Sequence, residues 1–92
     1  MIGGTFSEQP AAYLPDFPFD PTEARFIGKP VDFVVFRGLS AGVVGEVVFV
    51  KVQSGKSRLN RNESSIWNAV TTGRVSFFEY RAPAGITREP AD

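Results

Sequence analysis

The amino-acid sequence predicts an α/β or α+β fold, with elements in the order α-β-β-β-α-β and a mixed central sheet covered by helices. Two observations support this prediction. Residues 31–36 and 46–53 form apolar runs rich in valine and phenylalanine, which is typical of strands buried on both faces. The stretch between Asn60 and Gly73 repeats apolar side chains at helical spacing. Chains that mix strands and helices in this way pack the helices on the sheet.

The length of the chain is that of one domain. It has 92 residues, 42% of them apolar, with nine phenylalanines, which is enough for one compact core. We expect a single domain over residues 1–81. Residues 82–92 read APAGITREPAD and are expected to form a frayed tail.

The first third of the chain is broken up by prolines. Residues 2–14 predict a short helix, capped by Thr5 or Ser7 and limited by Pro10. Three further prolines, at positions 15, 18 and 21, exclude helix and predict an extended or turning segment. Residues 25–27 follow as a possible short strand that ends at Gly28.

The two main strands are expected over residues 31–36 and 46–53, joined by a glycine-rich connection over residues 37–45. In the second strand, alternation places Lys51 and Gln53 on one face. The following helix begins with the pair Asn60 and Glu63, which has the spacing of a capping box. Gly73 fits the end of this helix, and residues 76–80 predict a last strand.

The composition excludes several kinds of chemistry. The chain contains no cysteine and no histidine, which excludes disulfides, thiolate metal sites and histidine-based catalysis. Carboxylates, lysines and a hard cation bound by oxygens remain. The first residues do not form a signal peptide, and no apolar run reaches the ~18 residues of a membrane span. We therefore expect a cytoplasmic protein that does not enter a membrane.

The charges are unevenly distributed along a chain whose net charge is zero. Residues 1–36 carry five acids against two bases, whereas residues 37–81 carry seven bases against three acids. A basic turn holds Lys56, Arg58 and Arg61, just before and at the start of the predicted helix. These side chains could contact nucleic-acid phosphates, since helix N-termini favour anions. An ordinary solvated surface explains them equally well.

Three polar residues interrupt the apolar strands: Asp32 in the first, and Lys51 and Gln53 at the end of the second. A polar group in a buried strand costs free energy unless it is paired or used for function. These residues are therefore the candidate site. The simpler interpretation is an aspartate satisfied by the backbone or by a lysine, and a strand end that merges into a turn.

Two stretches extend this pattern, FPFDPTEARFIGKPVDFVVF and VVFVKVQSGKSRL. With them, residues 3–81 resemble predicted endonucleases distantly related to archaeal Holliday junction resolvases, in the PD-(D/E)XK nuclease superfamily. The resemblance implies a restriction-endonuclease-like core and metal-dependent hydrolysis of phosphodiesters. In such nucleases an aspartate and a glutamate on neighbouring strands hold Mg²⁺, and a lysine lies near the attacking water.

The resemblance assigns these roles to residues of this chain. Glu8 matches a carboxylate on the first helix, and Asp32 matches the strand aspartate. Lys51 stands at the glutamate position and Gln53 at the lysine position, because the family pattern E-V-K-T-G-K-S reads K-V-Q-S-G-K-S here.

The lysine at position 51 removes one of the negative charges that would bind a metal ion. An ammonium group beside the metal position would repel the metal ion, so we expect Lys51 to pair with Asp32 instead. Glu46 lies five residues before Lys51, on the opposite face of a regular strand, and cannot replace the lost carboxylate. We therefore predict a degenerate catalytic site that binds no metal and needs no cofactor.

Three hypotheses follow from the sequence. The first is a catalytically degenerate endonuclease-like domain that retains weak DNA binding. The second is an active Mg²⁺- or Mn²⁺-dependent endonuclease that uses Glu8 and Asp32 with a displaced third ligand. The third is a homo-oligomeric scaffold with no nucleic-acid role, because a chain this short gains stability by burying aromatic surface between copies. A homodimer is the expected assembly.

Overall fold

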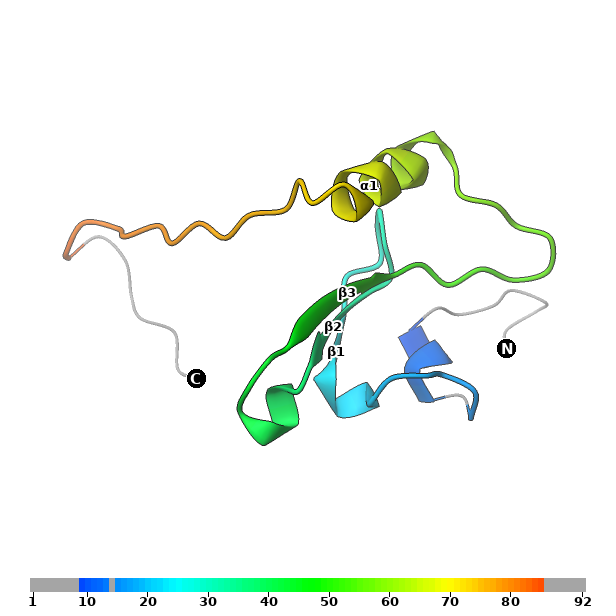
Figure 1. The fold of residues 1–92 in the computed structure, drawn as a ribbon, viewed down its shortest axis with the longest axis horizontal. Coiled ribbons are helices and arrows are strands. Elements are labelled where there is room, and N and C mark those ends of the chain that lie inside the picture. The colour runs from blue at the N-terminus through cyan, green and yellow to red at the C-terminus, as the bar shows by residue number, and fades with distance from the viewer. Residues whose placement is uncertain (1–8, 14, 86–92) are drawn as a thin grey trace.

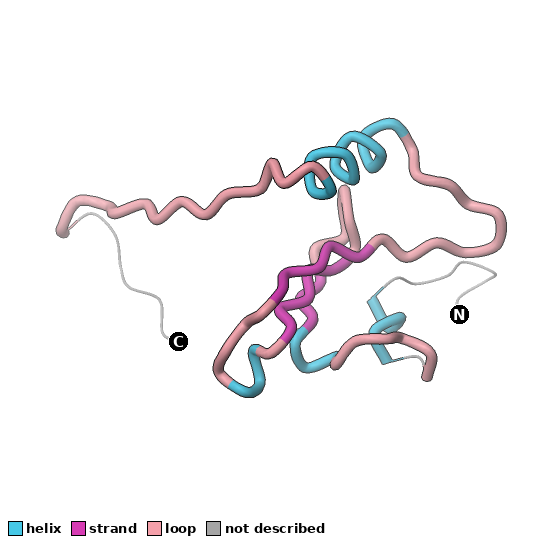
Figure 2. Tube along the Cα trace, in the orientation of Figure 1, coloured by secondary structure: helices cyan, strands magenta, loops and turns pink. Residues whose placement is uncertain are grey.

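The structure, a computed structural model, describes residues 9–13 and 15–85 and shows a small α+β fold. Figures 1 and 2 show a sheet, a helix beyond one end of it and a long extended segment. The strands are β1 (Ala24–Phe26), β2 (Phe33–Arg37) and β3 (Glu46–Val50), and the helix is α1 (Arg61–Thr71). Three short 3-10 turns, η1 (Gln9–Tyr13), η2 (Pro21–Glu23) and η3 (Leu39–Ala41), complete the elements.

The sheet is antiparallel throughout, in the order β1-β2-β3. β2 is central and carries the most buried apolar side chains, Phe33 and Val35. Phe33 lies opposite Val50 and Val35 lies opposite Val48, so these four side chains share one face. Aromatic and β-branched residues suit such a surface, which explains why this segment forms the core strand.

The core lies on one face of the sheet only. Phe33 packs there with Ala11 and Ala12 of η1, and the ring of Phe17 lies 5.8 Å from that of Phe33. The prediction that both faces are covered is therefore wrong. β3 in particular has an exposed valine, Val47, on the other face. No helix of the described residues covers this second face, because α1 lies beyond the end of the sheet (Figure 1).

The connection between β2 and β3 depends on Gly38. Its φ of 100° lies in the left-handed region that side chains disfavour. A Cβ at this position would also collide with the carbonyl oxygen of Val43. The Gly38 carbonyl accepts hydrogen bonds from the backbone N–H groups of Ala41 and Val43, at 3.0 and 3.2 Å, and closes the turn around η3. The predicted glycine-rich connection is thus confirmed as a hairpin.

Helix α1 begins and ends as the sequence predicts. The Asn60 side chain accepts a hydrogen bond from Glu63 N at 2.8 Å, and Glu63 accepts one from Asn60 N at 2.9 Å, which confirms the capping box. At the other end Gly73 has a φ of 78°. Gly73 N donates to Val70 O, and Arg74 N donates to Ala69 O, which is a Schellman motif.

Two predicted features of the sheet are wrong. Within residues 9–13 and 15–85 the sheet contains no parallel pair, so it is not mixed there. Residues 76–80 are extended, but they form no strand because no described segment pairs with their backbone. The strand expected over residues 46–53 ends at Val50, and the short strand expected over residues 25–27 is β1, displaced by one residue.

The predicted N-terminal helix is described only in part. Residues 9–13 form the 3-10 turn η1 rather than an α-helix, and Glu8 lies outside the described residues. Of the expected tail, residues 82–83 continue the extended segment, residues 84–85 form a turn, and the others also lie outside the described part. Within the described residues, no helix has the length and apolar character that crossing a membrane requires.

Candidate functional site

Asp32 lies at the end of the sheet where β1 ends, β2 begins and β3 ends. Its carbonyl oxygen accepts a hydrogen bond from Ile27 N at 2.7 Å, and its own N–H donates to Val50 O at 2.9 Å. The second bond is offset by one residue from the register that places Phe33 opposite Val50. Two consecutive residues thus face Val50, as in a β-bulge. Backbone bonds on both sides therefore fix the position of Asp32.

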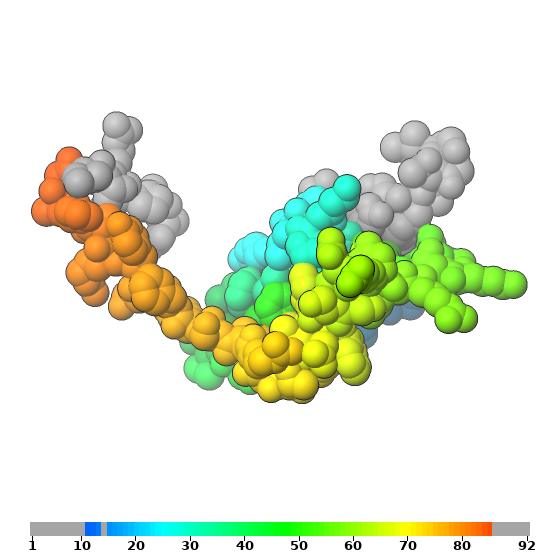
Figure 3. Space-filling model, turned by 90° about the horizontal axis from the view of Figure 1, so that it is seen from above, coloured from blue at the N-terminus to red at the C-terminus, as the bar shows by residue number. Residues whose placement is uncertain are grey.

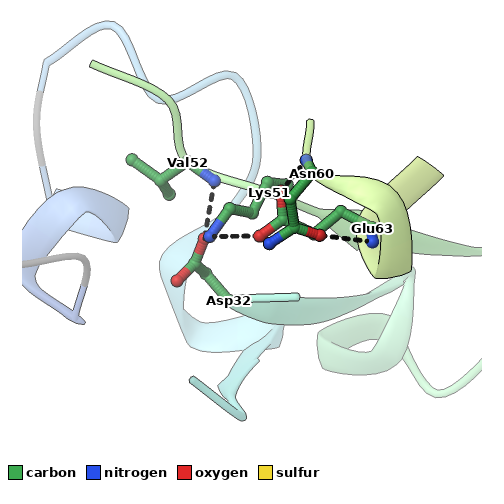
Figure 4. Close-up of polar contacts among 5 residues, drawn as sticks. All are labelled: Asp32, Lys51, Val52, Asn60 and Glu63. Atoms are coloured by element: carbon green, nitrogen blue, oxygen red, sulfur yellow. Dashed lines mark hydrogen bonds and ion pairs between the residues drawn. The ribbon is translucent and has the colours of Figure 1, made fainter. Parts of the chain in front are cut away.

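The Asp32 side chain is 1% exposed, and its two carboxylate oxygens differ in their partners. Oδ2 accepts a hydrogen bond from Val52 N at 2.7 Å and lies 3.5 Å from the Lys51 ammonium nitrogen. Oδ1 is buried and has no hydrogen-bond partner among the described residues. Figure 4 shows the carboxylate pointing toward the chain that follows β3. The carboxylate, rather than a strand carbonyl, thus accepts the Val52 N–H just beyond the end of β3.

Lys51 joins two carboxylates. Its Nζ lies 3.5 Å from Asp32 Oδ2 and 3.2 Å from Glu63 Oε2, and its side chain is 23% exposed (Figure 4). Burial by itself would lower the pKa of Lys51, but the nearby carboxylates of Glu63 and Asp32 outweigh it and raise the pKa above the usual value. Lys51 is therefore charged at neutral pH. The predicted contact between Lys51 and Asp32 is confirmed.

Glu63 has two functions in this cluster. One oxygen completes the capping box and the other pairs with Lys51. The pKa of Glu63 is lowered, first by the hydrogen bond from the Asn60 backbone and then by Lys51. The sequence identified Glu63 only as a capping residue. Its pairing with Lys51, twelve residues away, depends on the path of loop 51–60, for which the sequence contains no signal.

A polar pocket of about 370 Å³ lies beside Lys51. It is lined by Gly28, Lys29, Pro30, Lys51, Asn60, Asn62 and Glu63. It therefore lies between the β1–β2 connection and the first turn of α1. Asp32 does not line it, because Lys51 and Glu63 lie between the buried carboxylate and this opening.

Gln53 and Glu46 do not join this cluster, and the predicted Glu8 lies outside the described residues. Gln53 is exposed and lines a separate groove with Phe17 and Val52. Glu46 pairs with Arg37 at 2.8 Å, at the hairpin end of the sheet. The structure therefore brings together two of the predicted residues, Asp32 and Lys51, and adds Glu63.

The three basic residues lie on the surface. Lys56 and Arg58 are exposed in loop 51–60, and Arg61 is the exposed first residue of α1. In Figure 3 this loop protrudes from the body of the molecule at one side. The side chains of Lys56, Arg58 and Arg61 are therefore accessible to a large ligand.

The described residues contain no group of three or more acidic side chains that could hold a metal ion. Asp32 and Glu63 are the two acids nearest each other at this site, and the Lys51 ammonium lies between them. The cluster therefore balances two carboxylates with one fixed cation. Chemically, it can tie β3 to α1 and hold a charged group at the edge of the pocket.

A second buried acid, Glu23, was not identified from the sequence. Its Oε2 accepts hydrogen bonds from Ser40 N at 3.0 Å, Ser40 Oγ at 2.8 Å and Gly38 N at 3.2 Å. The backbone bond from Ser40, followed by the bond from its hydroxyl, lowers the pKa of Glu23. Because all its donors are neutral groups of one turn, this carboxylate fastens η2 to η3.

Comparison with protein families matches residues 1–82 to the family described as "Endonuclease related to archaeal Holliday junction resolvase". Comparison with curated proteins and with solved structures gave no match. The match spans every described strand and α1, together with Asp32, Lys51 and Glu63. The chain belongs to the family of endonucleases related to archaeal Holliday junction resolvases.

Proposed function

We propose that this chain is a catalytically degenerate domain of the PD-(D/E)XK nuclease type that binds nucleic acid without cleaving it. The observation that carries the proposal is the position of the Lys51 ammonium group. It lies 3.5 Å from Asp32 and 3.2 Å from Glu63, so it occupies the space between two carboxylates that a metal ion would otherwise require. The lysine thus stands in for the metal ion that the family resemblance implies.

The residues at this position do not fit a divalent metal. Two unit charges 4 Å apart interact with about 4 kcal/mol at the effective dielectric of a protein surface, so a divalent ion beside Lys51 would meet about twice that repulsion. Asp32 Oδ2 is also engaged by the Val52 N–H. Gln53 carries no charge and lies in a different groove. No hydrolytic step is therefore assigned to Asp32, Lys51 or Gln53.

Substituting Lys51 tests this proposal directly. Lys51→Glu places three carboxylates together, so we expect the variant to be less stable than the natural chain without metal and to be stabilised by Mn²⁺. A ligand at one hundred times its Kd stabilises the folded state by about 2.7 kcal/mol. The natural chain should show no shift of its thermal midpoint with Mn²⁺. Lys56→Glu, which changes the same charge on the exposed loop, is the matched control.

Isothermal titration with divalent metal ions can contradict the proposal. Stoichiometric Mg²⁺ or Mn²⁺ binding by the natural chain, abolished by Asp32→Ala, would exclude a degenerate site. Cleavage of branched or single-stranded DNA with Mn²⁺ would then establish the alternative, an active endonuclease that uses Glu8 and Asp32. The feature that favours this alternative is Asp32 Oδ1, which is buried and has no hydrogen-bond partner.

The nucleic-acid part of the proposal is supported by the exposed basic residues Lys56, Arg58 and Arg61. They lie in loop 51–60 and at the start of α1, where the chain neighbours of Arg61, Asn60 and Asn62, line the same pocket as Lys29 and Lys51. Lysine and arginine bind phosphates independently of base sequence, and such binding weakens steeply with salt. A weak, salt-dependent DNA complex is therefore the expected activity.

Binding of labelled duplex and branched DNA at several salt concentrations tests this part. Replacing Lys56, Arg58 and Arg61 together by alanine should lower the affinity and flatten its dependence on salt. Each lost phosphate contact changes the slope by roughly 0.9 for duplex DNA. Arg25→Ala, on the exposed edge strand β1, is the control. Unchanged binding by the triple variant would exclude this surface.

The homo-oligomeric scaffold is also favoured by a specific observation. α1 has no buried residue, and the segment that follows it exposes three aromatic side chains. A sharp dimer with no DNA binding at low salt would support this scaffold over the nucleic-acid module.

A further inference from the structure

The segment Arg74–Tyr80, here called the arm, leaves α1 as an extended chain. No backbone hydrogen bond joins residues 75–80 to any other described residue. Phe77, Phe78 and Tyr80 are 94%, 82% and 74% exposed. Three neighbouring aromatic side chains in water are a large apolar surface without a partner. The arm therefore carries the features of a strand that lacks its sheet.

The pattern of the arm is that of a strand covered on both faces. Alternation places Val75 and Phe77 on one face, and Phe78 and Tyr80 on the other. Apolar residues on both faces are typical of internal strands rather than of edge strands. At about 3.3 Å per residue, residues 75–80 span about 20 Å, which is slightly longer than a five-residue strand.

The end of α1 directs the arm away from its own sheet. The bonds from Gly73 N to Val70 O and from Arg74 N to Ala69 O, at 3.1 and 2.8 Å, fix the direction in which the chain leaves the helix. Figures 1 and 3 show the arm extending outward from the body. The radius of gyration is 16.1 Å, against about 12 Å for a compact domain of this length.

The sheet has a free edge that matches the arm. β3 is the last strand in the order β1-β2-β3, so one side of its backbone has no neighbouring strand among the described residues. Four of its five residues are apolar, and Val47 is exposed. An apolar edge strand of this kind favours the addition of another strand. One chain thus carries both a strand without a sheet and an edge without a strand.

We propose that the arm of each copy adds as a strand to the β3 edge of a second copy, so that two chains exchange arms around a twofold axis. The second copy is the occupant because the same chain supplies both complementary surfaces and because the cap of α1 points the arm outward. Such reciprocal exchange closes and leaves no open end for further growth. This inference goes beyond nucleic-acid binding and does not depend on it.

Light scattering over a range of concentrations gives the first test. The full chain should form a dimer that dissociates on dilution. The variant with Phe77→Asp and Phe78→Asp should raise the dissociation constant about tenfold or more, since buried aromatic anchors contribute most to an interface. Val43→Asp, at an exposed valine in the hairpin turn, should leave the dimer intact. Circular dichroism checks that all variants are folded.

Cross-linking distinguishes exchange from an arm that folds back on its own sheet. The chain contains no cysteine, so cysteines can be introduced one at a time at positions 75–80 in one batch and as Val47→Cys in another. After mixing and oxidation, at least one arm position should form a covalent dimer, because a disulfide needs its Cα atoms within about 7 Å. Val43→Cys should form none with the arm.

A chain that carries both cysteines completes the test. When it is diluted into an excess of the cysteine-free natural chain before oxidation, exchange predicts that its cross-link is lost. A cross-link that survives dilution, within one chain, would overturn the proposal in favour of a self-docked arm. A monomer at every concentration would overturn it as well. DNA binding, measured separately, decides the nucleic-acid proposal.

Discussion

Two buried carboxylates lie at opposite ends of the β2–β3 hairpin, and they are stabilised in different ways. Glu23, at the hairpin turn, accepts three hydrogen bonds from neutral donors of Gly38 and Ser40. Asp32, at the other end, accepts one backbone hydrogen bond and lies beside the ammonium group of Lys51. One carboxylate oxygen of Asp32 has no hydrogen-bond partner in the described part of the chain.

The difference separates an acid satisfied by neutral groups of one turn from an acid that is paired with a charged side chain. Neutral donors from a single turn satisfy Glu23 locally, and the contacts of its carboxylate do not extend beyond η3. The surroundings of Asp32 instead contain a charged partner, a second acid on α1 and a pocket beside them. The proposed function therefore rests on the Asp32 end of the sheet, where the buried acid has a cationic partner, and not on Glu23.

The largest expected effect comes from removing the acid that depends on a cation. Asp32→Ala leaves the Val52 N–H without its acceptor and Lys51 without one of its two carboxylates. We expect the free energy of unfolding to fall by about 3 kcal/mol, measured by urea denaturation. Asp32→Asn keeps an acceptor for Val52 and should lose less. Equal losses for both variants would show that the charge, not the hydrogen bond, carries the effect.

A smaller effect should appear on acidification. The pKa values of Glu23 and Glu63 are both lowered in the folded state. Their stabilisation is therefore complete above the unfolded value near 4.5 and is lost as the pH falls through the lower folded values. The raised pKa of Lys51 matters only at alkaline pH. The stabilisation from charged Lys51 is complete below its unfolded value of 10.5 and is lost as the pH rises through the higher folded value.

Urea midpoints at pH 6 and at pH 3 measure this loss. Glu23→Gln and Glu63→Gln should each reduce the difference between the two midpoints, because glutamine does not titrate. If Glu63→Gln alone reduces it, the neutral donors around Glu23 do not favour its ionised form, and the contrast between the two ends of the hairpin would need revision.

The smallest effect is expected for the ion pair between Arg37 and Glu46. Both side chains are more than half exposed, although their atoms lie 2.8 Å apart. Exposed pairs of this kind contribute little, so Arg37→Ala should cost about 0.3 kcal/mol and less at high salt. A loss as large as that for Asp32→Ala would show that exposure does not decide the strength of these pairs.

The features that the sequence predicted well are local ones. The capping box of Asn60 and Glu63 and the end of α1 at Gly73 depend on residues a few positions apart, and the structure confirms them. The two apolar runs likewise became β2 and β3. The Lys51 contact with Asp32 was predicted from the family resemblance, which places an ammonium where a metal ligand is expected, and the structure confirms the contact.

The features that sequence reasoning missed depend on partners distant in the chain. Glu23 meets Ser40 across seventeen positions, and no spacing rule joins them. Gln53 does not share a face with Lys51, as strand alternation predicted, because the strand ends before Val52, whose N–H donates to the Asp32 carboxylate. Gln53 therefore lines a different groove. The arm has the composition of a strand, but a strand forms only against another backbone, which its own sequence cannot supply.

The ion pair between Lys51 and Glu63 gives the molecule two levels of stability. Helix α1 has no buried residue, and its Glu63 forms the ion pair that links it to the chain leaving β3. Breaking this pair would release α1 and residues 53–60, while Val52 stays bonded to Asp32 and packed on the core with Phe33, so opening of this part costs much less than global unfolding. The basic loop is therefore the part of the described fold best suited to adapt its shape to a ligand at little cost.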